Sequence, residues 1–131
     1  MPLPADSALS PLDDRAYHAL ADAVLAAIER QADAWLQDGV VDIDPQRTGG
    51  LLELALPDGS KVVVNKQPPL RELWLAARLG GFHFRWADGL WRDTKDGVEF
   101  FTRLSEQLSA QARVPLTIAA DGPRPGSDPA R

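Results

Sequence analysis

Cysteine is absent from this 131-residue sequence, and only two histidines are present. The absence of cysteine excludes disulfides, thiolate metal sites, iron–sulfur ligation by this chain and a thiol nucleophile. It agrees with a reducing compartment, and we expect a cytoplasmic protein. No apolar run approaches the roughly 20 residues that a membrane-spanning helix needs, so we expect no membrane association. The start, MPLPADSALSP, has neither the basic nor the apolar region of a signal peptide.

The sequence also lacks the common motifs of enzymes. No Glu-x-x-His pair lies in a predicted helix, which argues against a buried di-iron centre of the ferritin type. No glycine-rich phosphate loop precedes a helix, no serine lies in a nucleophile motif, and no zinc-ligand spacing occurs. We therefore expect a protein that is not an enzyme.

Charge is distributed unevenly along the chain. The net charge of −5 disfavours binding to a nucleic-acid backbone. Residues 1–58 hold 11 acidic and 3 basic residues, whereas residues 59–131 hold 8 acidic and 11 basic residues. The first half thus predicts an acidic face, which is either solvated surface or a site for a cation or a basic partner.

Two amphipathic helices are predicted, one over residues 12–36 and one over residues 97–112. Asp13 or Asp14 can cap the first helix, and Gly39 ends it. Its apolar stripe consists of Tyr17, Leu20, Ala21, Val24 and Ile28. The second helix carries Val98, Phe101, Leu104 and Leu108 on one side.

The chain between these helices reads as short strands joined by tight turns. The first strand is expected over residues 40–44, and Asp58-Gly59 and Asp88-Gly89 are hairpin signals. Residues 114–120 form a last short strand or an extended cover. This order predicts an α+β fold, a two-layer sandwich with two helices on one face of an antiparallel sheet of about six strands. We expect the domain to span residues 12–120, between a flexible leader (1–11) and a disordered tail (121–131).

The segment NKQPPLRELWLAARLGG, residues 65–81, permits two interpretations. Its apolar residues recur with helical spacing, and its composition favours a helix, which would bury Trp74 in an apolar stripe. As a strand, the segment would place Leu73 and Leu75 on one face and Trp74 on the other. Trp74 is therefore either a core residue or a contact residue on an open sheet face.

An acidic stripe follows the outer face of the first predicted helix and continues beyond it. The helical spacing places His18, Asp22, Glu29 and Asp33 on one side, and Asp38, Asp42 and Asp44 extend the run. Like charges at helical spacing cost roughly 0.2–0.5 kcal/mol per pair, which a cation or a basic partner would relieve. Carboxylates with at most one imidazole suit hard cations such as iron, manganese, magnesium or calcium. No set of side chains converges into a metal cage, so a cation should bind weakly and at the surface. Selectivity should be poor, so that one divalent cation can replace another.

The chain resembles the frataxin family, specifically its bacterial CyaY branch, over about residues 12–119. The resemblance rests on residues 49–84 and 88–106 and on a long first helix that ends in Trp35. Its most specific part is Asn65-x-Gln67-x-Pro69-Leu70-x-x-x-Trp74-Leu75, followed by Gly80-Gly81-Phe82-His83-Phe84. The resemblance implies that residues 71–77 form a strand in the central sheet, with Trp74 on the open face.

The resemblance also implies a function in iron–sulfur cluster assembly. The acidic stripe and its extension, which we call the acidic ridge, would bind iron (Fe²⁺ or Fe³⁺) and dock on the cysteine desulfurase. The open sheet face would contact the assembly machinery. The resemblance carries the metal-binding role over to Asp22, Glu29, Asp33, Asp42 and Asp44. We add Asp38 and His18 as candidate metal-binding residues from the acidic run and the helical spacing. The implied partner-binding residues are Asn65, Gln67 and Trp74. Arg30 and Ala34 stand where many bacterial members carry further acids, so this ridge is thinner than usual.

We thus expect an iron-binding regulator or iron donor that docks on the cysteine desulfurase and the scaffold protein, and that is monomeric unless loaded with iron. Two alternatives stay open. One is a ferroxidase-like iron store that oligomerises with iron. The other is a metal-independent adaptor whose acids only steer a basic partner.

Overall fold

The structure, a computed structural model, describes residues 12–120. The predicted leader (1–11) and tail (121–131) lie outside the described residues. The elements are helix α2 (Asp14–Gln37), strands β1 (Asp44–Thr48), β2 (Leu51–Ala55), β3 (Lys61–Gln67), β4 (Glu72–Ala77), β5 (Gly80–Ala87) and β6 (Leu90–Asp93), and helix α3 (Phe100–Ala112). A short 3₁₀ helix, η1 (Pro68–Leu70), precedes β4.

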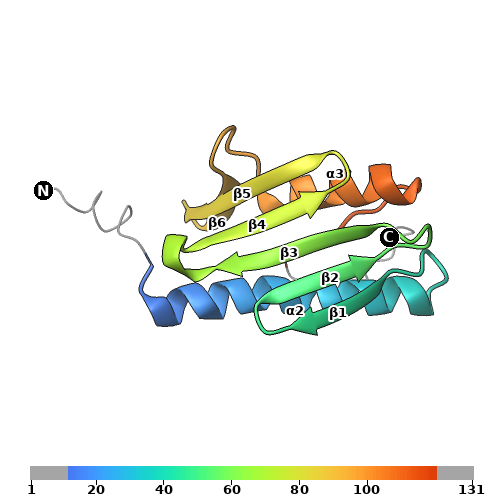
Figure 1. The fold of residues 1–131 in the computed structure, drawn as a ribbon, viewed down its shortest axis with the longest axis horizontal. Coiled ribbons are helices and arrows are strands. Elements are labelled where there is room, and N and C mark those ends of the chain that lie inside the picture. The colour runs from blue at the N-terminus through green and yellow to red at the C-terminus, as the bar shows by residue number, and fades with distance from the viewer. Residues whose placement is uncertain (1–11, 121–131) are drawn as a thin grey trace, which may run out of the picture.

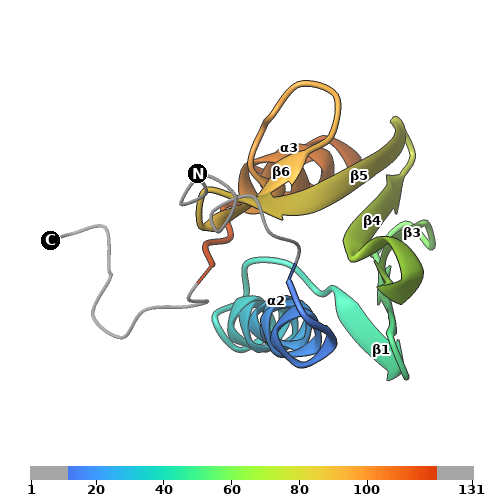
Figure 2. The ribbon, with the colours of Figure 1, turned by 90° about the vertical axis from the view of Figure 1, so that its left-hand side faces the viewer.

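The six strands form one sheet in the order β1-β2-β3-β4-β5-β6, and each neighbouring pair is antiparallel. Both helices lie on the same face of this sheet (Figures 1 and 2). The core fills the space between the helices and that face, with Tyr17, Leu25 and Ile28 of α2, Leu104 and Leu108 of α3, and Leu52, Val64, Leu73 and Phe84 of the sheet. The predicted two-layer α+β sandwich is confirmed.

Helix α2 begins and ends as its sequence predicts. The Asp13 carboxylate accepts a hydrogen bond from the Ala16 N–H at 2.7 Å, which caps the first turn. At the other end Gly39 adopts a φ of +71°, and the Val40 N–H donates to the Trp35 carbonyl at 2.9 Å. Glycine suits this left-handed position, so the chain reverses there at little cost. None of the helices within residues 12–120 is long and apolar enough to cross a membrane.

The ambiguous segment is a strand. Leu73 and Leu75 are 0% and 1% exposed on the core side of β4, and Trp74 lies on the opposite, open face. Backbone pairing with β3 and β5 and burial of the two leucines outweigh the local helix propensity, which is a weak preference. Within residues 65–81 only the three residues of η1 are helical. Arg71 then adopts a left-handed φ of 52°, and β4 begins at the next residue.

The predicted first strand over residues 40–44 is wrong. The strand runs from Asp44 to Thr48, because Val40 is used in the end of α2 and the two-residue turn Gly49-Gly50 sets Thr48 opposite Leu51. Asp42 therefore precedes the strand, and Asp42 and Asp44 do not share a strand face as expected.

The last apolar segment is an extended cover and not a strand. Leu116 and Ile118 are buried against the helix layer. The Ser109 hydroxyl accepts from the Leu116 N–H at 2.8 Å, and the Ser105 hydroxyl accepts from the Ile118 N–H at 2.9 Å. Serine side chains on α3 thus replace the strand partner that these backbone groups would otherwise need.

Candidate functional site

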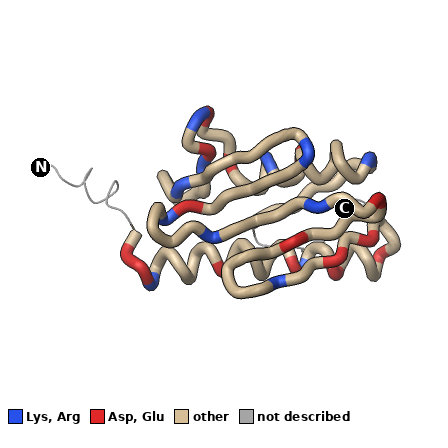
Figure 3. The backbone as a smooth tube through the Cα atoms, viewed as in Figure 1, with Lys and Arg blue, Asp and Glu red and all other residues tan. Residues whose placement is uncertain are grey.

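The acidic ridge consists of Asp22, Glu29, Asp33, Asp38, Asp42 and Asp44. Acidic positions gather along α2 and the β1 side of the molecule (Figure 3). Asp22 and Glu29 are half-buried and the other four are exposed. Within residues 12–120, no group of three or more His, Cys, Asp or Glu side chains is placed to hold a metal ion together. The ridge is therefore an extended acidic surface and not a preformed metal cage.

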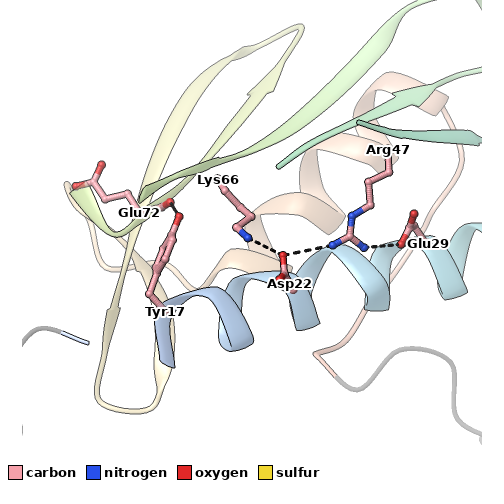
Figure 4. Close-up of polar contacts among 6 residues, drawn as sticks. All are labelled: Tyr17, Asp22, Glu29, Arg47, Lys66 and Glu72. Carbon is pink, nitrogen blue, oxygen red and sulfur yellow. Dashed lines mark hydrogen bonds and ion pairs between the residues drawn. The ribbon is translucent and has the colours of Figure 1, made fainter. Parts of the chain in front are cut away.

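Asp22 and Glu29 are engaged by two bases from the sheet (Figure 4). The Lys66 ammonium lies 2.7 Å from the Asp22 carboxylate, and the Arg47 guanidinium lies 3.3 Å from Asp22 and 3.0 Å from Glu29. The expected uncompensated repulsion along the stripe is thus wrong for these two acids. Asp22 and Glu29 face the edge of the sheet, where Arg47 joins carboxylates two helical turns apart.

Register explains why the two bases reach the helix. Lys66 pairs with Leu73 and Arg47 pairs with Leu52, so both bases stand on the helix-covered side of the sheet. Sequence reasoning missed both bases. Lys66 continues the inward-facing series of Val62 and Val64, and this alternation is the signal that could have identified it. Strand β1 carries no such alternation, so only its pairing with β2 assigns Arg47 a side.

Gly50 makes room for Lys66. A Cβ at Gly50 would lie 3.2 Å from the Lys66 Cβ, and the Lys66 N–H donates to the Gly50 carbonyl at 2.8 Å. The Lys66 side chain is only 10% exposed, so its stem is buried over Gly50 while its ammonium reaches Asp22.

The remaining acids lie around the C-terminal end of α2, in the connection to β1 and at the first residue of β1. Asp33 accepts from the Gln37 amide at 3.2 Å, and Asp38 is the C-cap residue. In the described part of the chain no ion pair involves Asp33, Asp38, Asp42 or Asp44. The last turn of α2 also carries no basic residue. Because a helix C-terminus is itself negative, this end of the ridge is the part whose charge is least compensated.

His18 lies one helical turn before Asp22 on α2, and within residues 12–120 no ion pair joins it to an acid of the ridge. It is half-buried beside Tyr17, with ring centroids 5.0 Å apart. The Tyr17 hydroxyl donates to the Glu72 carbonyl at 2.8 Å, and burial raises the pKa of Tyr17, which keeps the phenol protonated. The Tyr17 hydrogen bond thus joins α2, next to His18, to the start of β4 (Figure 4 shows Tyr17 and Glu72).

The open sheet face carries the predicted partner-binding residues side by side. Asn65, Trp74 and His83 are directly paired across β3, β4 and β5, and Gln67 lies in the adjacent row. The Trp74 and His83 rings are stacked, with centroids 4.1 Å apart and planes 7° apart. A shallow groove beside the stack is lined by Leu51, Val63, Asn65, Trp74, Phe82 and His83.

Glu72 is a member of this face that sequence reasoning missed. Its side chain is 5% exposed, and its carboxylate accepts from the Trp74 indole N–H at 2.9 Å and pairs with Arg85. In the sequence it looks like an ordinary solvent-facing polar residue of β4. Its burial depends on the strand register, which places Arg85 opposite it and Trp74 two residues further along the same face.

Comparison with known proteins identifies the family. A model of the frataxin-like domain matches residues 10–114. Proteins named iron-sulfur cluster assembly protein CyaY, from Burkholderia mallei and Burkholderia pseudomallei, are 49% identical over 109 residues, which cover 83% of this chain and 100% of theirs.

Solved structures agree with the sequence relatives. A frataxin from Psychromonas ingrahamii superposes with a TM-score of 0.70 at 30% identity and covers 83% of this chain and 98% of its own. Yeast frataxin gives a TM-score of 0.62 at 27% identity, with 83% and 89% covered. The resemblance that the sequence motifs indicated is confirmed, and the chain belongs to the frataxin family.

Proposed function

We propose that this protein acts in iron–sulfur cluster assembly, as an iron-binding regulator or iron donor that docks on the cysteine desulfurase and its scaffold protein. The observation that carries the proposal is family membership: relatives named for iron–sulfur cluster assembly match along their whole length. The acidic ridge and the Trp74 face are the two surfaces through which this chain would act.

The acidic ridge supplies the iron-binding part of the proposal. Its ligands are carboxylate oxygens, which suit hard cations, and their exposure favours weak binding with little selectivity. Asp22 and Glu29 are already paired with bases, so iron would be held first by Asp33, Asp38, Asp42 and Asp44. His18 would contribute only as a neighbouring group.

The same ridge and the open sheet face supply the docking part. An acidic surface steers a basic patch of the desulfurase toward the helix side. Trp74, with Asn65 and Gln67, offers an aromatic anchor flanked by amides, a combination typical of binding hot spots. On this proposal the protein is cytoplasmic, monomeric without iron, and modulates its partners without turning over a substrate.

The test is a pull-down with purified desulfurase and scaffold protein, with and without Fe²⁺. Wild-type protein should be captured, Trp74→Ala should weaken capture, and Asp33→Lys with Asp38→Lys should weaken capture and remove its dependence on iron. Failure of the wild-type protein to bind either partner under both conditions would overturn the proposal. An NMR titration with Fe²⁺ locates the binding site within residues 22–44: resonances over residues 33–44 should shift first, before those around Asp22 and Glu29.

A second candidate, the metal-independent adaptor, is favoured by the internal ion pairs of Asp22 and Glu29. If the acids serve only docking, Fe²⁺ leaves the thermal stability unchanged, whereas a ligand that binds the native state must raise it. The ferroxidase-like store instead requires Fe²⁺ oxidation faster than the buffer background, together with assembly driven by metal. Melting curves and oxidation rates measured on the same samples separate the three.

A further inference from the structure

Glu72 is buried on a sheet face that no helix within residues 12–120 covers. Both helices lie on the other side of the sheet (Figure 2), yet the Glu72 side chain is only 5% exposed. A carboxylate loses much of its hydration when it is covered, which is unfavourable unless other groups compensate. The residues that cover Glu72 are therefore also the residues that must satisfy it.

Three side chains surround the carboxylate. The Trp74 indole N–H donates to Oε1 at 2.9 Å, the Arg85 guanidinium pairs with Oε2, and the His83 Nδ1 lies 4.0 Å from Oε1. Register brings them together, because Arg85 is opposite Glu72 and His83 is opposite Trp74 on β5. One carboxylate thus organises the aromatic pair and the neighbouring cation.

The position of Glu72 is itself fixed from the helix side. Its carbonyl accepts a hydrogen bond from the buried Tyr17 hydroxyl at 2.8 Å (Figure 4). The preceding Arg71 pairs with Asp14 at 2.7 Å. Tyr17 and Asp14 both belong to α2. The start of β4 is therefore held by α2 on one face of the sheet, while the Glu72 carboxylate binds Trp74 and Arg85 on the other face.

Trp74 is held at two points as a result. Glu72 binds the edge of the indole that carries the N–H, and His83 covers one ring face at 4.1 Å. The N–H is consumed inside the protein, so what remains for a partner is apolar ring carbon beside the Asn65 amide and the shallow groove.

We propose that Glu72 is a positioning residue that fixes the Trp74 indole against His83, so that a partner is recognised through the apolar part of the ring and not through its N–H group. The inference rests on the proposed docking of the open sheet face. It predicts that the partner presents an apolar or aromatic side chain to Trp74, with a hydrogen-bonding group directed at Asn65 and no acceptor for the indole. Fixing a side chain before binding reduces the entropy that association must overcome.

The first test needs no partner. The Trp74 indole N–H resonance is assigned with Trp74→Phe and then followed in Glu72→Gln and Glu72→Ala. We expect Glu72→Ala to move this resonance more than those of the other three tryptophans, and Glu72→Gln to move it less, because the amide oxygen can still accept. Glu53→Ala is the matched control, since Glu53 stands on the same face in β2 and pairs with Lys61. An indole resonance that Glu72→Ala leaves in place would overturn the inference.

The second test measures affinity for the desulfurase–scaffold complex in a double-mutant cycle. Glu72→Ala should weaken binding by about tenfold in the wild-type background and by less than about twofold in the Trp74→Ala background, because coupled residues are not additive. Glu72→Gln should restore most of the affinity, and Glu106→Ala, on helix α3 at the other side of the sheet, should leave it unchanged.

Equal losses in both backgrounds would mean that Glu72 acts on its own, which contradicts the inference. Circular dichroism and melting curves of each variant establish that it is folded, and Glu72→Gln keeps the test available if Glu72→Ala unfolds. A wild-type protein that does not bind the complex at all would overturn the proposed function, whereas the indole resonance would still decide the role of Glu72.

Discussion

The Lys66 ammonium lies 2.7 Å from the Asp22 carboxylate, although 44 positions separate the two residues in the sequence. The pair joins the middle of the sheet to the first helix and neutralises part of the ridge from within. With Arg47 added, the ridge divides into a compensated part at Asp22 and Glu29 and an uncompensated part at the end of α2.

Arg47→Gln should increase the affinity of the ridge for a divalent cation. The substitution frees Glu29 and leaves Asp22 with Lys66 alone, so the local field becomes more negative. We expect a gain of about 3- to 10-fold for Mn²⁺, equivalent to about 0.6–1.4 kcal/mol, with new paramagnetic broadening around residues 22–29.

The matched control for this experiment is Lys95→Gln, which removes the same charge from an exposed position between β6 and α3, away from the ridge. If Lys95→Gln produces the same gain and the same broadening, then only net charge matters, and the specific pairing of Arg47 has no bearing on cation binding.

Gly50→Ala should destabilise the fold, because the new Cβ would lie 3.2 Å from the Lys66 Cβ. The buried stem of Lys66 must then move by a few tenths of an ångström, and because Lys66 is held by the Gly50 carbonyl and by Asp22, we expect a cost of about 1 kcal/mol, the low end for overpacking. Urea denaturation measures the effect, and NMR of the Lys66 side chain reports the shift. An unchanged free energy of unfolding would show that the β2–β3 pair absorbs the methyl group freely.

Leu73→Ala and Trp74→Ala should have opposite consequences, although the residues are adjacent. Leu73 is fully buried in the core, so its truncation should cost about 2–5 kcal/mol of stability. Trp74 lies on the open face, so its truncation should leave the domain folded and weaken binding to the desulfurase–scaffold complex. Thermal melts and binding titrations of both variants provide the comparison; a Trp74→Ala protein that unfolds would place Trp74 in the core.

Tyr17→Phe should cost about 0.5–1.5 kcal/mol, because the Glu72 carbonyl loses its buried donor. Burial raises the pKa of Tyr17 above its ordinary value of 10.0. A group whose folded-state pKa is raised contributes stability below the unfolded pKa, and this contribution is lost as the pH rises through the folded value. The wild-type protein should therefore lose stability above pH 10, and Tyr17→Phe should lose less. Urea unfolding at about pH 8 and about pH 11 checks the sign.

Periodicity and turn chemistry predicted most of the fold. The caps at Asp13 and Gly39 and the hairpin signals at Asp58-Gly59 and Asp88-Gly89 are local features, and each has its expected structural role. The predicted first strand begins too early in the chain. The Val40 N–H is used in a hydrogen bond to the Trp35 carbonyl at the end of α2, and the alternation of residues 40–44 gives no sign of this bond.

The candidate site was predicted by residue type but not by contact. The sequence identifies acids with helical spacing, whereas their pairing with Arg47 and Lys66 depends on which side of a strand each base occupies. Burial of Glu72 likewise follows from the register of β4 against β5. Trp74 was placed correctly only through the family resemblance, because the residues of this segment alone permitted both a helix and a strand.

The extended cover after α3 sets a practical limit on shortening this protein. The family model ends at residue 114, but Leu116 and Ile118 are buried further along the chain. A truncation after Val114 would open the space under both side chains and would leave the hydroxyls of Ser105 and Ser109 without their backbone partners. The smallest piece that keeps the native packing therefore extends at least through Ile118, so a boundary drawn from the family match alone would cut into the core.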